Sequence, residues 1–425
     1  MKNLQLDTSS VEGSVSRRLF LQASFGAAIA TMGDGMAFSE SREQGKSKDE
    51  PTGEQPTGKQ PRRYVCIDAE GTHRELGRQH GGQAVEYIKT HLDYMQASMK
   101  LSKADLEHRA MQFRPLLSKH CPHLLDEIAG LAEGARISPA EALSVNIRGA
   151  LSLAEPLAEG SQQNVKTSDG GCTAFAITRE KCADGNLLIG QNSDMLPAMV
   201  DMAYVLRLRP TGKPAIMTWT FGGMIGYHGV NSRGIAHFAN DLGGGPKARF
   251  GLPHYPLKRL ALECSDLDEV LELFRTYPLA SNGNYVLCDG TGRILDIEAT
   301  TDGPEILSDE NRGFLAHANH FLSTRYATKA NWAVSTKDSF ARQQRIEELI
   351  TDRLGSVTLQ DMQANLRSRD RHVAGICRVG KTPGSTPDWE QSGITVASII
   401  AEPLRGKLHV AAANDPANPF VEYTF

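Results

Sequence analysis

The sequence predicts an α+β protein whose first half is rich in helices and whose second half is dominated by strands. Apolar residues recur at helical spacing between residues 83 and 120, whereas short runs of strand character follow one another after residue 171. The 425 residues include 40 glycines, which is typical of a chain with many tight turns rather than of a helical bundle. We therefore expect mixed sheets covered by helices.

The hydrophobic content and the net charge limit the size of the core and the kinds of molecule that the protein could bind. With 40% hydrophobic residues, the chain can fill the core of one large domain or of two ordinary ones. Its 46 Lys and Arg against 50 Asp and Glu give a formal net charge of -4. This balance excludes a general electrostatic attraction to nucleic acid or to anionic lipid.

Residues 1–38 have the pattern of an export signal. Ser16–Leu21 reads SRRLFL and precedes a mildly apolar run, Ala23–Ala30, and small residues around Ala37. This order is typical of a twin-arginine signal and predicts a periplasmic or secreted protein. A basic turn before a core helix is the alternative interpretation. No later stretch approaches the ~18 apolar residues needed to span a bilayer, so no stable membrane insertion is expected.

Residues 39–63 contain no aliphatic side chain and are predicted to form a disordered linker. A globular region then begins near Tyr64. Its helix candidates are Gln83–His120, Leu124–Glu133 and Ser138–Leu151, the last of which opens with a serine N-cap, a proline at the first helical position and a capping-box glutamate. A polar, glycine-rich loop, Glu159–Gly171, ends this helical part.

Strand patterns dominate the rest of the chain and are interrupted by four helix patterns. The predicted strands are Thr173–Thr178, Leu187–Gln191, Ala203–Leu208, Ala215–Thr220, Ile235–Asn240, Leu315–Leu322, Ile394–Ala401 and Lys407–Ala412. The predicted helices are Pro256–Cys264, Leu267–Thr276, Lys337–Thr351 and Thr358–Leu366.

Common catalytic and binding motifs are absent from the sequence or misplaced in it. Gly375–Thr382 fits the P-loop letter for letter, but the prolines that follow argue against the helix that a phosphate site needs. There is no GxSxG, HExxH or GxGxxG motif after a strand. The seven cysteines are an odd number and lack zinc spacing, so at least one thiol is unpaired. We predict neither a cofactor nor a metal.

The segment Asp169–Ile177 places Cys172 between a flexible glycine loop and a strand, a position suited to self-cleavage. The glycines before it leave the Gly171 carbonyl open to a thiolate and tolerate a strained backbone. Cleavage of the Gly171–Cys172 bond would give Cys172 an α-amino group with a reference pKa of about 7.7–8.0, which can act as base. The alternative is an inert buried cysteine.

At these residues the chain resembles the N-terminal-nucleophile hydrolases, and more closely the autoprocessing acyl-CoA:6-aminopenicillanic acid acyltransferase family. The resemblance runs from about residue 65 over most of the chain and rests on the order and spacing of several segments. These segments are Glu75–Gly81, Pro122–Gly134, Gly171–Thr173, Asp184–Gly185, Gly190–Asp194, Gly229–Gly234, Asn240, His317–Phe321 and Asp338–Arg345. It implies a four-layer αββα sandwich of two antiparallel-type sheets faced by helices.

The resemblance also implies roles for individual residues. Cys172 would be both the self-cleaving residue and the nucleophile on substrate. Asp194 would hold the new α-amino group, and Asn240 would donate its amide to the oxyanion. Without the resemblance, Asp194 reads as a turn or N-cap residue and Asn240 as part of an Asn-Asp turn.

The family resemblance also implies roles for two further residues, Asn319 and Arg342. Asn319 is similar to a family asparagine near the site, on a strand face that it shares with His317 and Phe321. Arg342 resembles the family arginine that steadies a carboxylate or the oxyanion, although a solvated helix face would also explain Arg342 and Arg345. For His317, a structural role stays as open as a catalytic one.

The substrate pocket departs from the family in two places. Gln191 stands where bile-salt and penicillin V amidases carry arginine and where penicillin-type acyltransferases carry glutamine. Ser193 stands where an aromatic residue is common, and we expect it to widen or hydrate the pocket. The sequence thus favours the acyltransferase branch but leaves the acyl chain and the amine open.

Together these features predict an exported enzyme that cleaves itself. Residues 64–171 would remain as a helix-rich small chain, bound to the catalytic chain of residues 172–425. Cys172 would take an acyl group from a small acylated amide, form a thioester and pass the acyl group to water or an amine. The alternatives are an acyl-CoA-dependent N-acyltransferase and an inactive secreted binding protein.

Overall fold

The structure is a computed structural model that describes residues 60–154, 171–332, 338–369, 375–379 and 393–425. These residues belong to one compact unit, Lys59–Phe425. The predicted export signal, most of the predicted linker and the glycine-rich loop up to residue 170 lie outside the described residues. Among the described helices, none has both the length and the apolar character required to cross a membrane.

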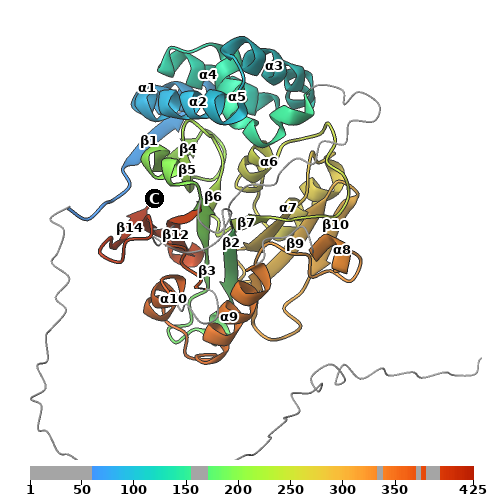
Figure 1. The fold of residues 1–425 in the computed structure, drawn as a ribbon. Coiled ribbons are helices and arrows are strands. Elements are labelled where there is room, and N and C mark those ends of the chain that lie inside the picture. Colours follow the sequence, from blue (N-terminus) through green and yellow to red (C-terminus); the bar gives the residue numbers. More distant parts are fainter. Residues whose placement is uncertain (1–59, 155–170, 333–337, 370–374, 380–392) are drawn as a thin grey trace, which may run out of the picture. The chain divides into compact units, whose positions relative to one another are not determined.

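The described elements form two sheets packed face to face, each covered by helices on its outer side (Figure 1). The larger sheet has the order β1 (Cys66–Gly71), β4 (Ala203–Pro210), β5 (Ile216–Phe221), β6 (His228–Asn231), β7 (Ala236–Asp241), β8 (Gly283–Cys288), β9 (Ile294–Thr300), β10 (Gly303–Leu307). The smaller has the order β11 (Phe314–His317), β2 (Cys172–Ile177), β3 (Leu188–Met195), β12 (Ile394–Glu402), β13 (Lys407–Ala412), β14 (Phe420–Thr424). Every pairing is antiparallel except that of β1 with β4, which is parallel and departs from the purely antiparallel expectation.

Helices from both halves of the chain cover the larger sheet, while helices near the C-terminus cover the smaller one (Figure 1). The first group is α1 (His73–Gln83), α2 (Val85–Met99), α3 (Lys103–His120), α4 (Pro122–Ala135), α5 (Pro139–Asn146), α6 (His254–Ala261) and α7 (Leu267–Thr276). The second is α9 (Ser339–Thr351) and α10 (Leu359–Leu366), while α8 (Lys329–Trp332) is a single turn. Short 3-10 helices span Arg148–Leu153, Arg179–Lys181, Pro197–Met202 and Pro403–Arg405.

The alternating pattern of β2 shows why the fold has four layers. Ala174 and Ala176 lie in the core between the two sheets, whereas Phe175 and Ile177 lie in the core between the smaller sheet and α9 and α10. Successive side chains of a strand point to opposite faces, so a strand that is apolar on both faces must be covered on both. The αββα sandwich implied by the family resemblance is confirmed.

Most element predictions hold, with boundaries shifted by a few residues, but two differ. The helix expected over residues 83–120 is two helices, because Lys100 adopts a left-handed conformation with φ 54° and Ser102 caps α3 by accepting from the Asp105 N–H. The strand expected over residues 315–322 ends at His317. Beyond it, the backbone N–H groups of Asn319 and Leu322 donate to the side chains of Ser339 and Glu298, so no strand partner remains for them.

Helices α1 and α4 pack backbone against backbone, and glycines make this possible. A Cβ atom on Gly77 would lie 1.8 Å from the Glu127 carbonyl oxygen, and one on Gly130 would lie 2.1 Å from the Arg74 carbonyl oxygen. Any larger residue would force the helices apart. The glycines of Glu75–Gly81 and Pro122–Gly134, two segments of the family resemblance, are therefore required by packing.

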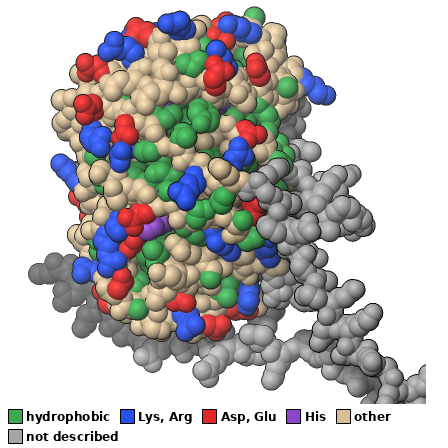
Figure 2. Space-filling view, turned by 90° about the vertical axis from the view of Figure 1, so that its left-hand side faces the viewer, with side chains coloured by type: hydrophobic (Ala, Val, Ile, Leu, Met, Phe, Trp, Pro, Cys, Tyr) green, Lys and Arg blue, Asp and Glu red, His purple; other side chains and the backbone are tan. Residues whose placement is uncertain are grey.

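The surface agrees with the small net charge. Figure 2 shows acidic and basic side chains interspersed over one face of the molecule, without an extended area of a single sign. This face supplies no general attraction for a polyanion.

Candidate active site

Cys172 is the first residue of β2, between β11 and β3 in the smaller sheet. Its backbone N–H donates to Asn319 Oδ1 at 2.8 Å, and its carbonyl oxygen accepts from Arg342 Nη1 at 2.5 Å. Arg342 Nη1 also donates to Thr173 Oγ1 at 2.9 Å. Side chains from outside the sheet therefore hold both backbone polar groups of Cys172, which fixes the position of its thiol.

The electrostatic surroundings of the thiol favour its neutral form in the uncut chain. Burial and, after it, the negative charge of Asp194 raise the pKa of the Cys172 thiol to about 12. The thiolate is the nucleophilic form of cysteine, so the thiol needs a base close by before it can attack. The same alternation that puts Ala174 between the sheets directs the Cys172 side chain there, away from the helices α9 and α10.

Gly171 lies beneath two guanidinium groups. A Cβ atom at this position would lie 2.6 Å from Arg378 Nη2 and 2.7 Å from Arg342 Nη2. Any side chain would displace at least one of the two arginines, so the close approach requires glycine. Both residues of the predicted scissile bond are thus in direct contact with the cationic side of the site.

Asp194 lies in β3 and is 1% exposed. Its Oδ1 accepts a 2.6 Å hydrogen bond from Thr395 Oγ1, and its Oδ2 lies 3.3 Å from Arg378 Nε. Burial raises the pKa of Asp194 to about 7, although the charges of Arg378 and Arg342 oppose the shift. A strand residue with these contacts is neither a turn residue nor a helix N-cap.

Two arginines and two aspartates form a continuous buried charge network beside Cys172. Arg378 Nη2 lies 2.5 and 2.6 Å from the two carboxylate oxygens of Asp338, and Arg342 Nε lies 3.3 Å from Asp338 Oδ2. Burial raises the pKa of Asp338, but Arg342 and Arg378 outweigh this effect and lower it overall. The network therefore runs from Asp194 through Arg378 and Asp338 to Arg342, and its formal charges balance.

The two arginines of α9 have different surroundings. Arg342 is fully buried and touches Cys172, whereas Arg345 is partly exposed and pairs with Glu348 at 3.4 Å. A solvated helix face does not describe Arg342. Arg378 is the residue that the sequence analysis missed: it lies in the P-loop-like segment, and only its ion pairs reveal a role.

Asn319 contacts Cys172 from the loop after β11. Its Oδ1 accepts from both Cys172 N–H and Arg342 Nη2, each at 2.8 Å. Its Nδ2 donates to the Asp241 carbonyl oxygen at 3.0 Å, which uses one of its two N–H groups. Because β11 ends at His317, the prediction that Asn319 shares a strand face with His317 and Phe321 is wrong.

Asn240 lies in β7, in the larger sheet, and links it to the smaller one. Its Nδ2 donates to the His317 carbonyl oxygen at 2.8 Å and to Asn284 Oδ1 at 3.3 Å, so contacts engage both N–H groups. Its Oδ1 accepts from Gln191 Nε2 at 2.5 Å. Asn240 is a strand residue rather than part of a turn, and oxyanion donation would require it to release one of these contacts.

The two candidate pocket residues lie on the same face of β3. Gln191 also donates from Nε2 to the Ala239 carbonyl oxygen at 2.7 Å and thereby bridges the sheets. Ser193 pairs with Cys172 across the strands, and its buried hydroxyl has no hydrogen-bond partner among the described residues. Gln191 is therefore fixed by the fold, whereas the Ser193 hydroxyl remains available beside the thiol.

His317, whose carbonyl oxygen accepts from Asn240, forms a buried ion pair with Glu298. Its Nε2 lies 3.2 Å from Glu298 Oε1, and both side chains are fully buried. Burial lowers the pKa of His317, but the charge of Asp296 and the contact with Glu298 outweigh this effect and raise it to about 9. An imidazole that is protonated and paired in this way is a structural cation, not a general base near neutral pH.

Lys258 on α6 is a buried cation on the larger-sheet side of the site. Its Nζ lies 4.2 Å from the ring centroid of Tyr227 and 5.5 Å from that of Tyr255. Burial lowers the pKa of Lys258 to about 8, and the charges of Asp241 and Cys172 oppose the shift. Among the described residues no carboxylate forms an ion pair with it within 4 Å.

Several known proteins are similar to this chain in sequence or in structure. The chain is 25% identical over 361 residues to the acyl-coenzyme A:6-aminopenicillanic-acid-acyltransferase 40 kDa form of Emericella nidulans, covering 84% of this chain and 95% of that protein. Among solved structures, a mutant of conjugated bile acid hydrolase from Clostridium perfringens matches at 14% identity with a TM-score of 0.38, covering 59% of this chain and 97% of the other. Penicillin V acylase from Agrobacterium tumefaciens matches at 14% identity with a TM-score of 0.35, covering 59% and 77%.

A family model matches more than half of the chain. The model described as acyl-coenzyme A:6-aminopenicillanic acid acyl-transferase matches residues 178–415, a stretch that begins just after β2 and includes Asp194, Asn240, Asn319, Arg342 and Arg378. That range spans more than half of the chain and includes strands of both sheets. This chain is a member of the acyl-coenzyme A:6-aminopenicillanic acid acyl-transferase family.

Proposed function

We propose that this protein cleaves itself before Cys172 and then uses Cys172 to hydrolyse a small acyl amide through a thioester. The observation that carries the proposal is a pair of hydrogen bonds to the backbone of Cys172. Its N–H donates to Asn319, and its carbonyl oxygen accepts from Arg342. Both contacts come from side chains rather than from a neighbouring strand, so they fix the first residue of β2 from outside the sheet. In a family of acyl-transferring enzymes, the contacts indicate a positioned nucleophile.

The first step is an acyl shift within the chain. The Cys172 sulfur attacks the Gly171 carbonyl carbon, the peptide C–N bond breaks, and the nitrogen leaves as the α-amine of Cys172. Water then hydrolyses the thioester, which returns the thiol and leaves a carboxylate on Gly171. Two guanidinium groups approach Gly171 closely, and their positive charge favours the anion that develops when the Gly171 carbonyl is attacked.

The second reaction uses the amine that the first one creates. With a thiol pKa near 12 in the uncut chain, very little thiolate is present at neutral pH. A free α-amino group on Cys172 lies within reach of the same thiol and can take its proton. Asp194, buried and close enough to shift the thiol pKa, would hold the protonated amine.

Two asparagines are candidates for the oxyanion donor. Asn319 touches Cys172 and commits one N–H group, to Asp241, whereas both N–H groups of Asn240 are engaged. We therefore place Asn319 first and keep Asn240 as the alternative. In either case the donor would act on the tetrahedral intermediate that forms at Cys172.

The charge of the pocket favours an anionic substrate. Lys258 has the charge and burial of a group that is completed by a ligand carboxylate, since no described carboxylate pairs with it. N-acyl amino acids present such a carboxylate next to the scissile amide. We expect them to be cleaved faster than their methyl esters, and Lys258→Met should abolish this preference.

Electrophoresis under denaturing conditions tests the core of the proposal. Wild-type protein should contain a fragment whose N-terminal sequence is Cys-Thr-Ala-Phe-Ala, and Cys172→Ala should remain one chain. Cys264→Ala provides the control, because Cys264 is buried far from β2 in the core under the larger sheet. Uncut wild-type protein with full amidase activity would contradict the mechanism, and uncut protein without activity would favour a binding protein.

Export and the choice of acceptor form a separate proposal. We propose that the twin-arginine segment directs the protein out of the cytoplasm. Because free acyl-CoA is scarce outside the cytoplasm, the acyl group would then pass to water. Replacing Arg17 and Arg18 by lysine should retain the protein inside the cell. Normal export of this variant would remove the argument for hydrolysis and make the acyl-CoA-dependent N-acyltransferase the leading alternative.

A further inference from the structure

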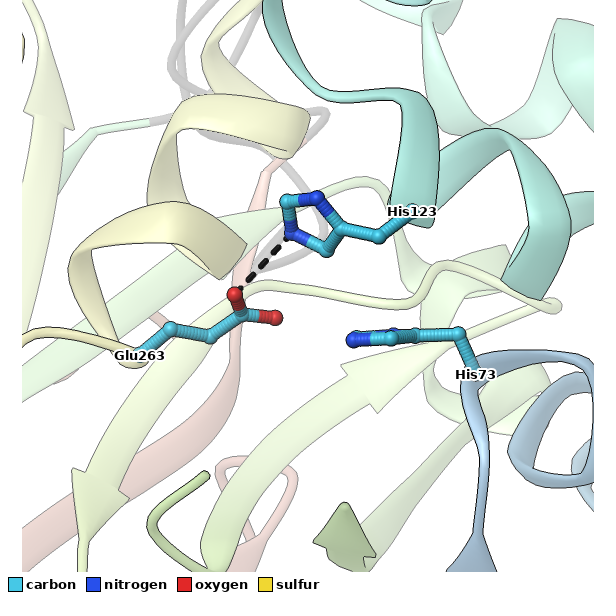
Figure 3. Close-up of side chains that lie close together, drawn as sticks. All are labelled: His73, His123 and Glu263. Carbon is cyan, nitrogen blue, oxygen red and sulfur yellow. Dashed lines mark hydrogen bonds and ion pairs between the residues drawn. The ribbon is translucent and has the colours of Figure 1, made fainter. Parts of the chain in front are cut away.

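Away from Cys172, three potential metal ligands converge between the helical layer and the segment that follows α6. His73 is the first residue of α1, His123 is the second residue of α4, and Glu263 follows α6. One donor atom from each lies within 4.8 Å of the other two, and Figure 3 shows the three side chains directed toward one another. The close glycine packing of α1 against α4 fixes the two histidines relative to each other.

A fourth side chain prepares His73 to act as a ligand. Glu127 Oε2 lies 2.8 Å from His73 Nδ1, and the Glu127 side chain is 1% exposed. This contact engages Nδ1, so Nε2 is the ring nitrogen that can bind an ion. In Figure 3 the far nitrogen of the His73 ring points toward the Glu263 carboxylate. A carboxylate behind a histidine is the usual second layer of a metal site.

The local charge permits a bound cation. Arg259, fully buried, lies 2.9 Å from Glu127 Oε2 and 3.4 Å from Glu263 Oε1. The buried groups, two carboxylates and one guanidinium, carry one net negative charge, and Lys213, which would balance it from 3.9 Å away, is about half exposed.

A second group of three potential ligands, with one histidine and two glutamates, is less suited to bind an ion. In the group Glu402, His409 and Glu422, Arg405 Nη1 lies 2.8 Å from Glu402 Oε2 and Lys407 Nζ lies 2.9 Å from Glu422 Oε2. Both carboxylates are already bound by cations at hydrogen-bond distance. In the first cluster the cations lie farther from the carboxylate: Arg259 Nη1 is 3.4 Å from Glu263 Oε1, which accepts no hydrogen bond from the described residues, and Lys213 Nζ is 3.9 Å from Glu263 Oε2.

We propose that His73, His123 and Glu263 form a binding site for a divalent transition-metal ion of the Zn²⁺ type. Two imidazoles and one carboxylate are a ligand set that Zn²⁺ accepts, with water in the fourth position. The side chains of His73 and His123 are 18% and 33% exposed, which gives the ion a path from solvent. Glu263, 4% exposed, forms the inner wall.

The site would connect two parts of the molecule that self-cleavage separates. His73 and His123 precede the Gly171–Cys172 bond, and Glu263 follows it. A bound ion would therefore hold the small chain to the catalytic chain after the peptide bond is lost. This consequence rests on the proposed self-cleavage, whereas ion binding itself does not.

Calorimetric titration of chelator-treated protein with Zn²⁺ tests the site. We expect one ion per chain, and we expect His123→Gln, which can still hydrogen-bond to Glu263, to weaken binding by more than about a hundredfold. His108→Gln is the matched control, because His108 is an exposed histidine on α3. Absence of binding, or equal binding by His123→Gln and the wild type, would overturn the proposal.

Two further measurements separate the site from folding and from cleavage. Co²⁺ substituted for Zn²⁺ should give a visible absorption spectrum typical of four-coordinate sites, and His73→Gln should remove it while circular dichroism confirms an intact fold. Uncut Cys172→Ala should bind Zn²⁺ as the wild type does. If it binds but the wild type is never cut, the site stands and the role in linking two chains falls. A normal fold whose Co²⁺ spectrum is unchanged in His73→Gln would overturn the site.

Discussion

Replacing Arg378 by methionine should destabilise the protein in a pH-dependent way. Arg378 is 9% exposed and joins two carboxylates, Asp194 with a fully buried side chain and Asp338 with a side chain that is 23% exposed. Methionine keeps much of the volume of the aliphatic stem but removes the charge. Asp338 retains Arg342 as a partner, whereas among the described residues Asp194 keeps the hydrogen bond from Thr395 and has no other ion pair within 4 Å.

The expected loss has two parts. Losing the charged hydrogen bonds to Asp338 should cost about 1.5–3 kcal/mol at any pH at which Asp338 is ionised. The second part comes from Asp194, whose pKa is about 7 in the presence of Arg378 and rises further without it. In the variant, folding then requires Asp194 to carry a proton that the unfolded chain lacks. The added cost grows by about 1.4 kcal/mol for each pH unit above 7.

Urea unfolding of the uncut Cys172→Ala chain provides the measurement. Arg378→Met should lower the free energy of unfolding by about 2 kcal/mol near pH 6 and by about 3–4 kcal/mol near pH 8. Arg353→Met is the control, because Arg353 is 65% exposed and lies 3.9 Å from Asp361, a surface pair that contributes about 0–1 kcal/mol. A loss below about 1 kcal/mol, or the same loss at both pH values, would refute the reasoning.

Three other outcomes follow from the site. Asn319→Ala should lower kcat by about a hundred- to a thousandfold with the fold retained, whereas Asn240→Ala should chiefly lower stability; the reverse result in kinetics and melting would exchange their roles. Gly171→Ala should slow self-cleavage, visible by electrophoresis, because its Cβ would meet both guanidinium groups. The pKa of His317 is raised to about 9, so its contribution to stability should be complete below about pH 6.5 and lost as the pH rises through 9. The pH dependence of melting should flatten in His317→Gln.

The sequence predicted the parts of the fold whose signal is local. The helix Leu267–Thr276 and the strand Lys407–Ala412 have the predicted boundaries, because amphipathic spacing and flanking turns mark them. The edge strand β14, Phe420–Thr424, lacks such a signal. It is a strand because β13 pairs with it, and a partner distant in sequence cannot be inferred from local pattern.

The same distinction applies to the site. Cys172 could be proposed as the nucleophile from its own neighbours, since the glycines before it and the strand after it are visible in one segment. Arg378 could not, because its function lies in ion pairs with Asp194 and Asp338, which are 184 and 40 positions away by residue number. Its local segment even resembles a P-loop, so pattern alone pointed to a different chemistry.

The position of Arg378 also bears on how the site can be built before it is used. In the proposed mechanism Asp194 binds an amine while buried, and an ionised buried carboxylate is costly without a partner. In the uncut chain no α-amine exists at Cys172, so Arg378 supplies the positive charge that Asp194 lacks. Once the amine forms, Asp194 can bind it while Arg378 remains paired with Asp338 at 2.5 Å. The network can thus accept a new cation without leaving any carboxylate unpaired, which a site built from Asp194 alone could not do.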